Sequence, residues 1–191
     1  MTDIAHPGFA DPVAGSQACF RAVLDAMARP GAVRAAGQGL TPPTPLDPAT
    51  AAVLLTLVDA ETPLFIAAGF APVRDWVAFH CGAAFAEASG CAFALCGALP
   101  EFDSVSAGSH LAPEESATVI LQVAARGRGA AYRLSGPGLR VPVVLEIDGL
   151  PADFAARWAA NHALFPRGVD VILCAGTSVA ALPRSVTVEA V

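Results

Sequence analysis

The sequence contains no lysine, and all 11 of its basic residues are arginine. Without a side-chain amine the chain cannot form the Schiff base of an ordinary pyridoxal-phosphate enzyme. It also lacks the lysine that a P-loop places against terminal phosphates. Charge of either sign is sparse: 15% of residues are charged and the net charge is −6. Clustered cations that would bind nucleic acid or an anionic membrane are therefore not expected.

Cysteine is infrequent and irregularly spaced, and no Cys-x-x-Cys motif occurs. The five cysteines mostly lie among apolar residues, which favours reduced thiols that serve as small core residues of a cytoplasmic protein. Cys91 and Cys96 fall in one predicted strand, five residues apart, and should face opposite sides rather than share an ion. No apolar run approaches the ~18 residues that a membrane span needs, and the N-terminus lacks a signal-peptide pattern. We expect no metal and no membrane association.

The remaining composition favours one domain over residues 1–191. A chain of this length that is 54% hydrophobic has enough apolar side chain for a sizeable core. Residues 1–12 hold Pro7, Gly8 and Pro12 and are expected to form a flexible or interface arm. Residues 37–48 are rich in proline and are expected to be an internal loop.

Periodicity predicts alternating helices and strands in the first half and mostly strands in the second. Helices are expected from Ser16 to Pro30, Pro48 to Asp59, Pro72 to Gly82 and Pro151 to Leu164. Strands are expected over 64–67, 91–96, 117–124, 131–134, 141–147, 169–174, 179–182 and 186–189. The strands over 117–124 and 131–134 are expected to pair as a hairpin that turns at Gly127 and Gly129. Pro142 indicates that the strand over 141–147 lies at the edge of a sheet. This order predicts an α/β protein, a three-layer α/β/α domain with a mixed sheet and helices on both faces.

Arginines around the predicted hairpin are one candidate for chemistry; they are Arg126, Arg128, Arg133 and Arg140. They would suit a phosphate or phosphonate, or they would pair with carboxylates across a subunit interface, and we favour the second reading. The sequence carries no Gly-x-Ser-x-Gly elbow and no His-Glu-x-x-His motif. No catalytic residue is predicted.

Four polar residues set in or beside apolar segments are the candidates for ligand binding: Arg21, His80, Asp170 and Arg184. A structural hydrogen bond or an interface pair is the favoured reading for each. Arg21 is four residues from Asp25 on one helix face and can pair with it. His80 precedes Cys81, but adjacent helical residues point about 100° apart, so the two do not make a thiol–imidazole pair by spacing alone.

Blocks along most of the chain resemble the PhnH subunit family of the bacterial carbon–phosphorus lyase system. In the first half these are Pro12-Val13, Phe20-Arg21, Met27-Ala28-Arg29-Pro30-Gly31, Leu54-Leu55-Thr56-Leu57, Asp59, Thr62-Pro63 and Phe79-His80. In the second half they are Ala112-Pro113-Glu114, Ala117 to Val123, Leu134-Ser135-Gly136-Pro137-Gly138, Phe165 to Asp170 and Leu182-Pro183-Arg184. Each block is weak alone, and their order and spacing make the resemblance specific.

The resemblance implies a non-catalytic structural subunit needed to break down organic phosphonates, assembled with the PhnG, PhnI and PhnJ subunits. It implies that the radical and iron–sulfur chemistry belongs to PhnJ and that this chain holds no cofactor. It also implies a homodimer and a fold similar to that of pyridoxal-phosphate transferases without their cofactor site. The alternative is an enzyme or binding protein that acts directly on a phosphonate or phosphorylated intermediate. That reading predicts a concave pocket at which His80, Arg21 or Arg184 converge.

Overall fold

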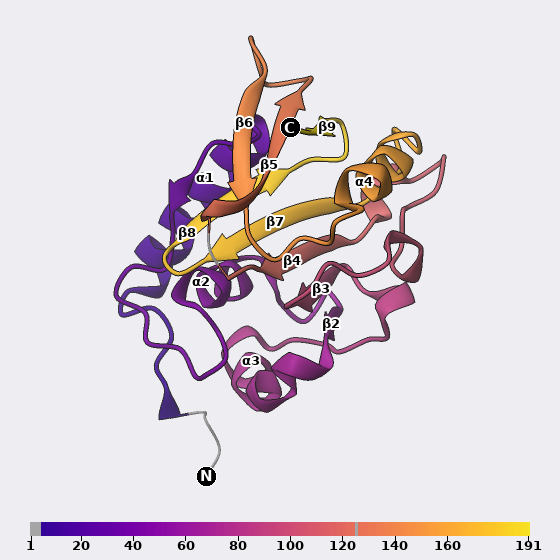
Figure 1. Cartoon of the computed structure of the whole chain (residues 1–191). Helices are drawn as coiled ribbons and strands as arrows, with labels where there is room; N and C mark the ends of the chain where they lie inside the picture. Colours follow the sequence, from indigo (N-terminus) through magenta and orange to yellow (C-terminus); the bar gives the residue numbers. More distant parts are fainter. Residues whose placement is uncertain (1–4, 125) are drawn as a thin grey trace.

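The computed structural model describes residues 5–124 and 126–191, and the side chains of residues 126–128 are outside the description. Figure 1 shows the arrangement of the elements. The α-helices are α1 (Pro12–Ala28), α2 (Pro48–Leu57), α3 (Arg74–Cys81) and α4 (Phe154–His162). The strands are β1 (Arg34–Ala35), β2 (Leu64–Ile66), β3 (Phe93–Cys96), β4 (Thr118–Gln122), β5 (Arg126–Ser135), β6 (Val143–Ile147), β7 (Asp170–Ala175), β8 (Ser178–Leu182) and β9 (Thr187–Ala190). Short 3₁₀ turns are η2 (Ala68–Val73), η3 (Ala88–Gly90), η4 (Phe102–Ser104) and η5 (Pro113–Glu115).

A six-stranded mixed sheet in the order β1-β8-β7-β4-β3-β2 forms the middle of the molecule. β2, β3, β4 and β7 run parallel, with Thr118 of β4 opposite Asp170 of β7 at their starts. β8 returns antiparallel beside β7, and β1 pairs antiparallel with β8. The inner strands are almost wholly apolar because parallel strands of this kind are covered on both faces.

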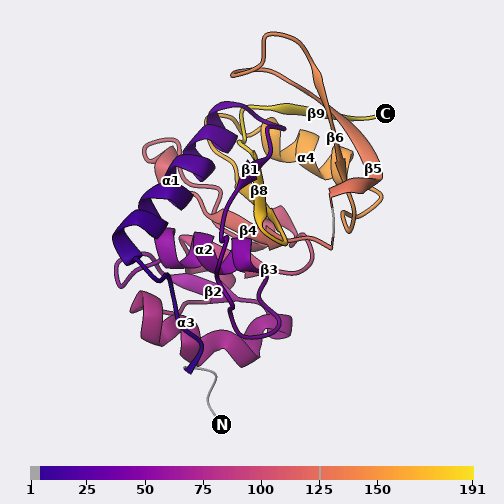
Figure 2. The same cartoon turned by 90° about the vertical axis from the view of Figure 1, so that its left-hand side faces the viewer.

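Helices α1, α2 and α3 cover one face of this sheet (Figure 2). α2 is apolar around its circumference and buries Ala49 through Leu54, as expected for a helix enclosed on all sides. Trp76 of α3 is fully buried in the same cluster, which also contains Ile120 and Ile172 from the sheet. α3 ends at Gly82, which adopts φ +63, so the predicted stop is confirmed.

The opposite face is covered by α4 together with a second, three-stranded antiparallel sheet in the order β6-β5-β9. Phe154 and Trp158 of α4 pack with Leu121 and Leu173 of the central sheet in one cluster. The prediction of an α/β protein with a mixed sheet and helices on both faces is confirmed. The second sheet was not predicted, and it covers this face together with α4.

The predicted hairpin between residues 117–124 and 131–134 is wrong. β4 lies inside the central sheet between β3 and β7, whereas β5 pairs with β6 and β9 in the second sheet. Gly129 adopts φ +101 beside the backbone of Ile147, where a Cβ would lie 2.6 Å from the Ile147 oxygen. The glycines therefore mark an irregularity in β5, and β6 is the edge strand that Pro142 suggested.

The first helix begins at Pro12, four residues before the predicted Ser16. The Asp11 carboxylate accepts hydrogen bonds from the backbone N–H groups of Val13 and Ala14, each 3.0 Å long, and Pro12 takes the first helical position. Aspartate followed by proline is a stronger start signal than serine inside an apolar run. The predicted Arg21–Asp25 pair does not form, because the Asp25 carboxylate binds Arg29 and Arg34 instead.

Candidate functional site

The Arg184 and Asp170 side chains form an ion pair at the end of the sheet where β7 begins. Arg184 Nη2 donates to Asp170 Oδ2 at 2.5 Å, and Arg184 Nε contacts both carboxylate oxygens at 3.2 Å. The Arg184 backbone N–H donates to Asp170 Oδ1 at 2.6 Å. Only 15% of the Arg184 side chain and 19% of the Asp170 side chain are exposed. These two candidate residues therefore lie together and bind each other.

Further bonds attach this pair to the surrounding segments. Arg184 Nη1 donates to the Pro113 carbonyl at 2.8 Å, which holds η5 in front of β4. The Arg184 carbonyl lies 2.9 Å from Nδ1 of His162 at the end of α4. The Arg184 guanidinium thus joins the turn after β8 to the start of β7 and to η5. Most of its N–H donors are engaged by these protein groups.

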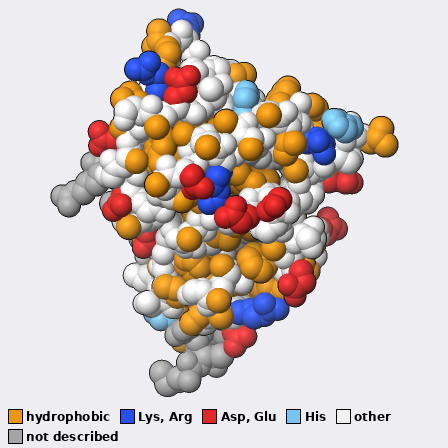
Figure 3. Space-filling model, turned by 45° about the vertical axis from the view of Figure 1, so that its right-hand side comes forward, with side chains coloured by type: hydrophobic (Ala, Val, Ile, Leu, Met, Phe, Trp, Pro, Cys, Tyr) orange, Lys and Arg blue, Asp and Glu red, His pale blue; other side chains and the backbone are white. Residues whose placement is uncertain are grey.

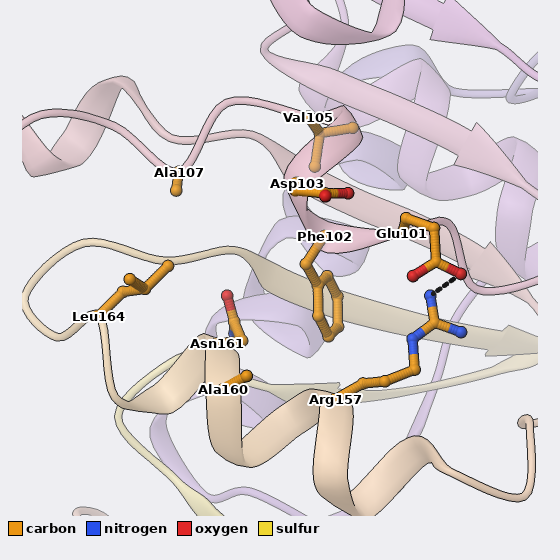
Figure 4. Close-up of a pocket in the computed structure, with 9 residues that line it drawn as sticks. All are labelled: Glu101, Phe102, Asp103, Val105, Ala107, Arg157, Ala160, Asn161 and Leu164. Atoms are coloured by element: carbon orange, nitrogen blue, oxygen red, sulfur yellow. Dashed lines mark ion pairs between the residues drawn. The ribbon is translucent and has the colours of Figure 1, made fainter.

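A cavity of about 490 Å³ lies beside this junction, between α4 and the segment that links β3 to β4 (Figure 4). It is lined by Glu101, Phe102, Asp103, Val105, Ala107, Arg157, Ala160, Asn161 and Leu164. Figure 3 shows the face that carries α4, with hydrophobic side chains spread over much of it between scattered charged ones. The volume lies within the range of small-molecule pockets.

The polar groups of the cavity are mostly bound to one another or to the backbone. Arg157 pairs with Glu101 at 3.1 Å and donates to the Pro100 carbonyl at 2.6 Å. The buried Asn161 amide accepts from the Val169 N–H at 2.8 Å and donates to the Val169 carbonyl at 2.9 Å. The cavity therefore offers mainly apolar contact, and chemically it suits an uncharged or apolar group.

Sequence reasoning missed these cavity residues. Arg157 and Asn161 sit on α4 three residues after Phe154 and three after Trp158, so they share or border the helix face that these two buried aromatic residues mark. That spacing was an available signal for Asn161. No local pattern pointed to Glu101, whose partner Arg157 is far along the chain.

His80 binds the N-terminal arm. Its Nε2 atom lies 3.0 Å from the His6 carbonyl, which also accepts a hydrogen bond from Nε1 of Trp76 at 2.8 Å. Burial raises the pKa of the neighbouring Cys81 to about 12, so that thiol stays protonated near neutral pH. A thiol activated by a neighbouring imidazole has a lowered pKa, whereas that of Cys81 is raised.

Arg21 lies on the exposed side of α1, apart from the other three candidates. His80 is on α3, while Asp170 and Arg184 are at the start of β7 and after β8. A second concavity, of about 300 Å³, lies between the turn after α1 and the tip of the β5–β6 hairpin. Its lining includes Arg29 and Arg140, and neither cavity is lined by Arg21, His80, Asp170 or Arg184.

Of the predicted arginine cluster, the side chains of Arg126 and Arg128 lie outside the described residues. Arg133 and Arg140 are exposed, on β5 and at the tip of the hairpin. Within the described residues no group of three or more His, Cys, Asp or Glu side chains is placed to hold a metal ion. The same described residues contain no helix with the length and hydropathy to cross a bilayer.

Cys91 and Cys96 do not face opposite sides, contrary to the prediction. Cys91 precedes β3, so strand alternation does not apply to it, and both thiols belong to the cluster on the α4 face. Burial, with a smaller contribution from Cys91, raises the pKa of Cys96 to about 11. None of the five cysteines, all of which are among the described residues, forms a disulfide, which is consistent with small core residues.

Comparison with known proteins gives two kinds of match. The family model described as "Bacterial phosphonate metabolism protein (PhnH)" matches residues 7–189. The chain is 37% identical over 195 residues to the alpha-D-ribose 1-methylphosphonate 5-triphosphate synthase subunit PhnH of Rhizobium meliloti, covering 99% of this chain and 98% of that protein. It is 41% identical over 78 residues to the putative C-P lyase subunit protein HtxG of Stutzerimonas stutzeri, covering 41% and 40% of the two chains.

Proposed function

Because the chain belongs to the PhnH family of bacterial phosphonate metabolism proteins, we propose that it is a non-catalytic subunit of a carbon–phosphorus lyase assembly. In that assembly it supports the breakdown of organic phosphonates by holding other subunits in place. The chemistry resides in those other subunits, and this chain contributes surfaces and stability. The observation that carries the proposal is the full-length likeness to a protein named as a subunit.

The contacts of the candidate residues support a structural role. Asp170 and Arg184 bind each other and the Pro113 carbonyl, and His80 binds the carbonyl of His6. Groups engaged in this way hold segments of the chain together, and a substrate would have to displace those bonds.

The partners we propose are PhnG, PhnI and PhnJ, together with a second copy of this chain. The location we propose is the cytoplasm, which mostly buried thiols that form no disulfide suit. The chain itself needs no cofactor. We further propose that the architecture is related to the pyridoxal-phosphate transferase fold without its cofactor site, which superposition on such an enzyme would test.

Co-expression tests the subunit role. A tagged copy of the chain, expressed with its neighbouring phosphonate genes, should elute with PhnG, PhnI and PhnJ in one size-exclusion peak. Deletion of its gene should abolish growth on methylphosphonate as the phosphorus source while growth on phosphate persists. Turnover of a phosphonate by the purified chain alone would refute the non-catalytic role, and separate elution would refute the assembly.

The cavity beside α4 favours one alternative, a chain that binds a small molecule. Its mainly apolar lining would hold the uncharged part of a ligand, with Arg157 at the rim. Calorimetric titration with ribose 1-methylphosphonate triphosphate and with methylphosphonate tests this alternative. Saturable binding to the wild-type chain, lost in an Ala160→Trp variant that still folds, would establish the binding function. If neither compound gives heat of binding, the alternative is refuted and the subunit role stands.

A further inference from the structure

Helix α1 presents an apolar face to solvent. It lies at the surface of the molecule, against α2 and β8, and runs along the left side in Figure 2. Val13, Phe20 and Leu24 are 80%, 51% and 58% exposed. Together with three exposed alanines they form what we call the outer face of α1: Val13, Ala14, Ala18, Phe20, Leu24 and Ala28.

The opposite side of the same helix is apolar as well. Cys19, Val23 and Ala26 are buried against the rest of the domain. A helix that is apolar on both sides is normally enclosed, whereas a surface helix carries charged residues toward water. Phe20, Leu24 and Ala28 follow one another at spacings of four, so they lie on one side of the helix, where Gln17 and Arg21 are also exposed. We conclude that something covers this apolar stripe, the outer face of α1, in the working protein.

The charges on α1 indicate what covers it. Arg21 is the only charged residue of the helix that is classed as exposed, and it lies beside Phe20 within the stripe. The nearest carboxylate along the helix, Asp25, is only 25% exposed and already pairs with Arg29 and Arg34. An occupant that buries Arg21 must therefore supply a carboxylate, because an unpaired guanidinium is costly to remove from water.

A second copy of this chain fits that requirement poorly. Two α1 helices packed about a two-fold axis bring the same stripe, with one Arg21 each, against itself. The exposed carboxylate of Asp11 caps its own helix through Val13 and Ala14. An antiparallel pairing that set Arg21 opposite Asp11 of the second copy would set Leu24 opposite Gly8, beyond the start of the facing helix. Leu24 and Ala28, one third of the apolar stripe, would then stay uncovered.

We propose that the outer face of α1 is the docking surface for a different subunit of the phosphonate-degrading assembly. That subunit presents an apolar surface that receives Phe20 and Leu24 and places an aspartate or glutamate opposite Arg21. This inference rests on the proposed function, since it names the surface through which the chain joins its assembly.

Substitutions on the outer face test the proposal within the co-expressed assembly. Phe20→Glu and Leu24→Glu keep a good helix former on an exposed position, so the chain should remain folded by circular dichroism and thermal unfolding. Each should reduce the amount of partner subunit retained on the tagged chain by about tenfold or more, the effect of removing a central anchor. Arg21→Glu should weaken retention similarly, and Arg21→Lys should weaken it less.

Phe79→Glu is the matched control. Phe79 is a phenylalanine on a different helix, α3, with 66% of its surface exposed. This variant should retain the partner subunits as the wild-type chain does. An equal loss with Phe79→Glu would assign the effect to surface charge in general and overturn the proposal.

The remaining outcomes separate the inference from the proposed function. If the wild-type chain itself retains no partner subunit, the proposed function fails. If the wild-type chain and all four α1 variants retain the partners equally, only the docking surface is wrong. If Phe20→Glu halves the mass of the isolated chain by light scattering, the stripe joins two copies, and the heterologous partner proposed here is refuted.

Discussion

Arg184 and Asp170 join the beginning of β7 to the turn that follows β8, with most of both side chains withdrawn from solvent. The same guanidinium holds η5 through the Pro113 carbonyl. Three segments at this end of the sheet therefore share one ion pair. The sequence placed Asp170 at the start of an apolar strand and Arg184 in a proline turn, and the pairing of β7 with β8 brings them together.

Asp170→Ala should lower the stability of the fold. The change leaves the Arg184 guanidinium part-buried without its carboxylate and removes an acceptor from the Arg184 backbone N–H. We expect the free energy of unfolding in urea at pH 7 to fall by about 2–4 kcal/mol, slightly less than for a fully buried pair. Arg29→Ala, which breaks an exposed pair with Asp25, should cost less than about 1 kcal/mol. Equal losses for the two variants would contradict this account.

The central sheet was predictable because its strands are short apolar runs between turn residues. β3 and β4 fall within predicted strands, and β7 and β8 each extend one residue beyond theirs, since burial on both faces leaves a continuous apolar signal. The second sheet was not predictable from local pattern. The first residues of β5 include glycines that resemble a hairpin turn after β4. The true partners of β5 are β6 and β9, in a sheet that packs on the α4 face.

The candidate residues were predictable only in part, for the same reason. Asp170 and Arg184 stood out as charges beside apolar strands, and they prove to be partners. Arg21 was expected to bind Asp25, but Arg34, brought close by the turn after α1, competes for that carboxylate. The cavity between α4 and the 101–107 segment depends on a tertiary contact that no sequence spacing encodes.

Asn161→Ala should be more destabilising than the loss of a small polar side chain suggests. The Asn161 amide is the hydrogen-bond partner of both the N–H and the C=O of Val169, which is fully buried. Leaving two buried backbone groups unpaired should lower the free energy of unfolding by about 3 kcal/mol. Gln17→Ala removes an exposed amide from α1 and should change it by less than about 0.5 kcal/mol. A comparable small effect for Asn161→Ala would show that water replaces the amide.

Deleting residues 1–7 should release the indole N–H of Trp76. Trp76 Nε1 donates to the His6 carbonyl, whereas Trp158 Nε1 donates to the buried Val186 carbonyl. We expect hydrogen exchange at the Trp76 indole, followed by NMR, to accelerate at least about tenfold in the truncated chain, because that donor loses its acceptor. The Trp158 indole provides the control in the same spectrum and should keep its rate. Unchanged exchange at Trp76 would mean that the arm does not protect it.

Cys81 should make the fold sensitive to alkaline pH. Burial raises the pKa of this thiol from 9.0 to about 12 in the folded chain. Below pH 9 the thiol is protonated in both folded and unfolded states, so its contribution to stability is fully present. As the pH rises from 9 toward 12, the unfolded thiol ionises while the folded one does not, and stability is lost, by at most about 1.4 kcal/mol per pH unit for one proton.

Cys81→Ala isolates this contribution because alanine does not ionise. Urea unfolding of the wild-type chain and the variant between pH 7 and 11 should give a constant difference in the free energy of unfolding up to about pH 8. Above pH 9 the wild-type chain should lose stability more steeply than the variant. The Cys96 thiol, whose pKa is raised to about 11, is present in both chains and cancels in the difference. Parallel curves throughout would show that Cys81 ionises in the folded chain as it does in the unfolded one, and so is reached by water.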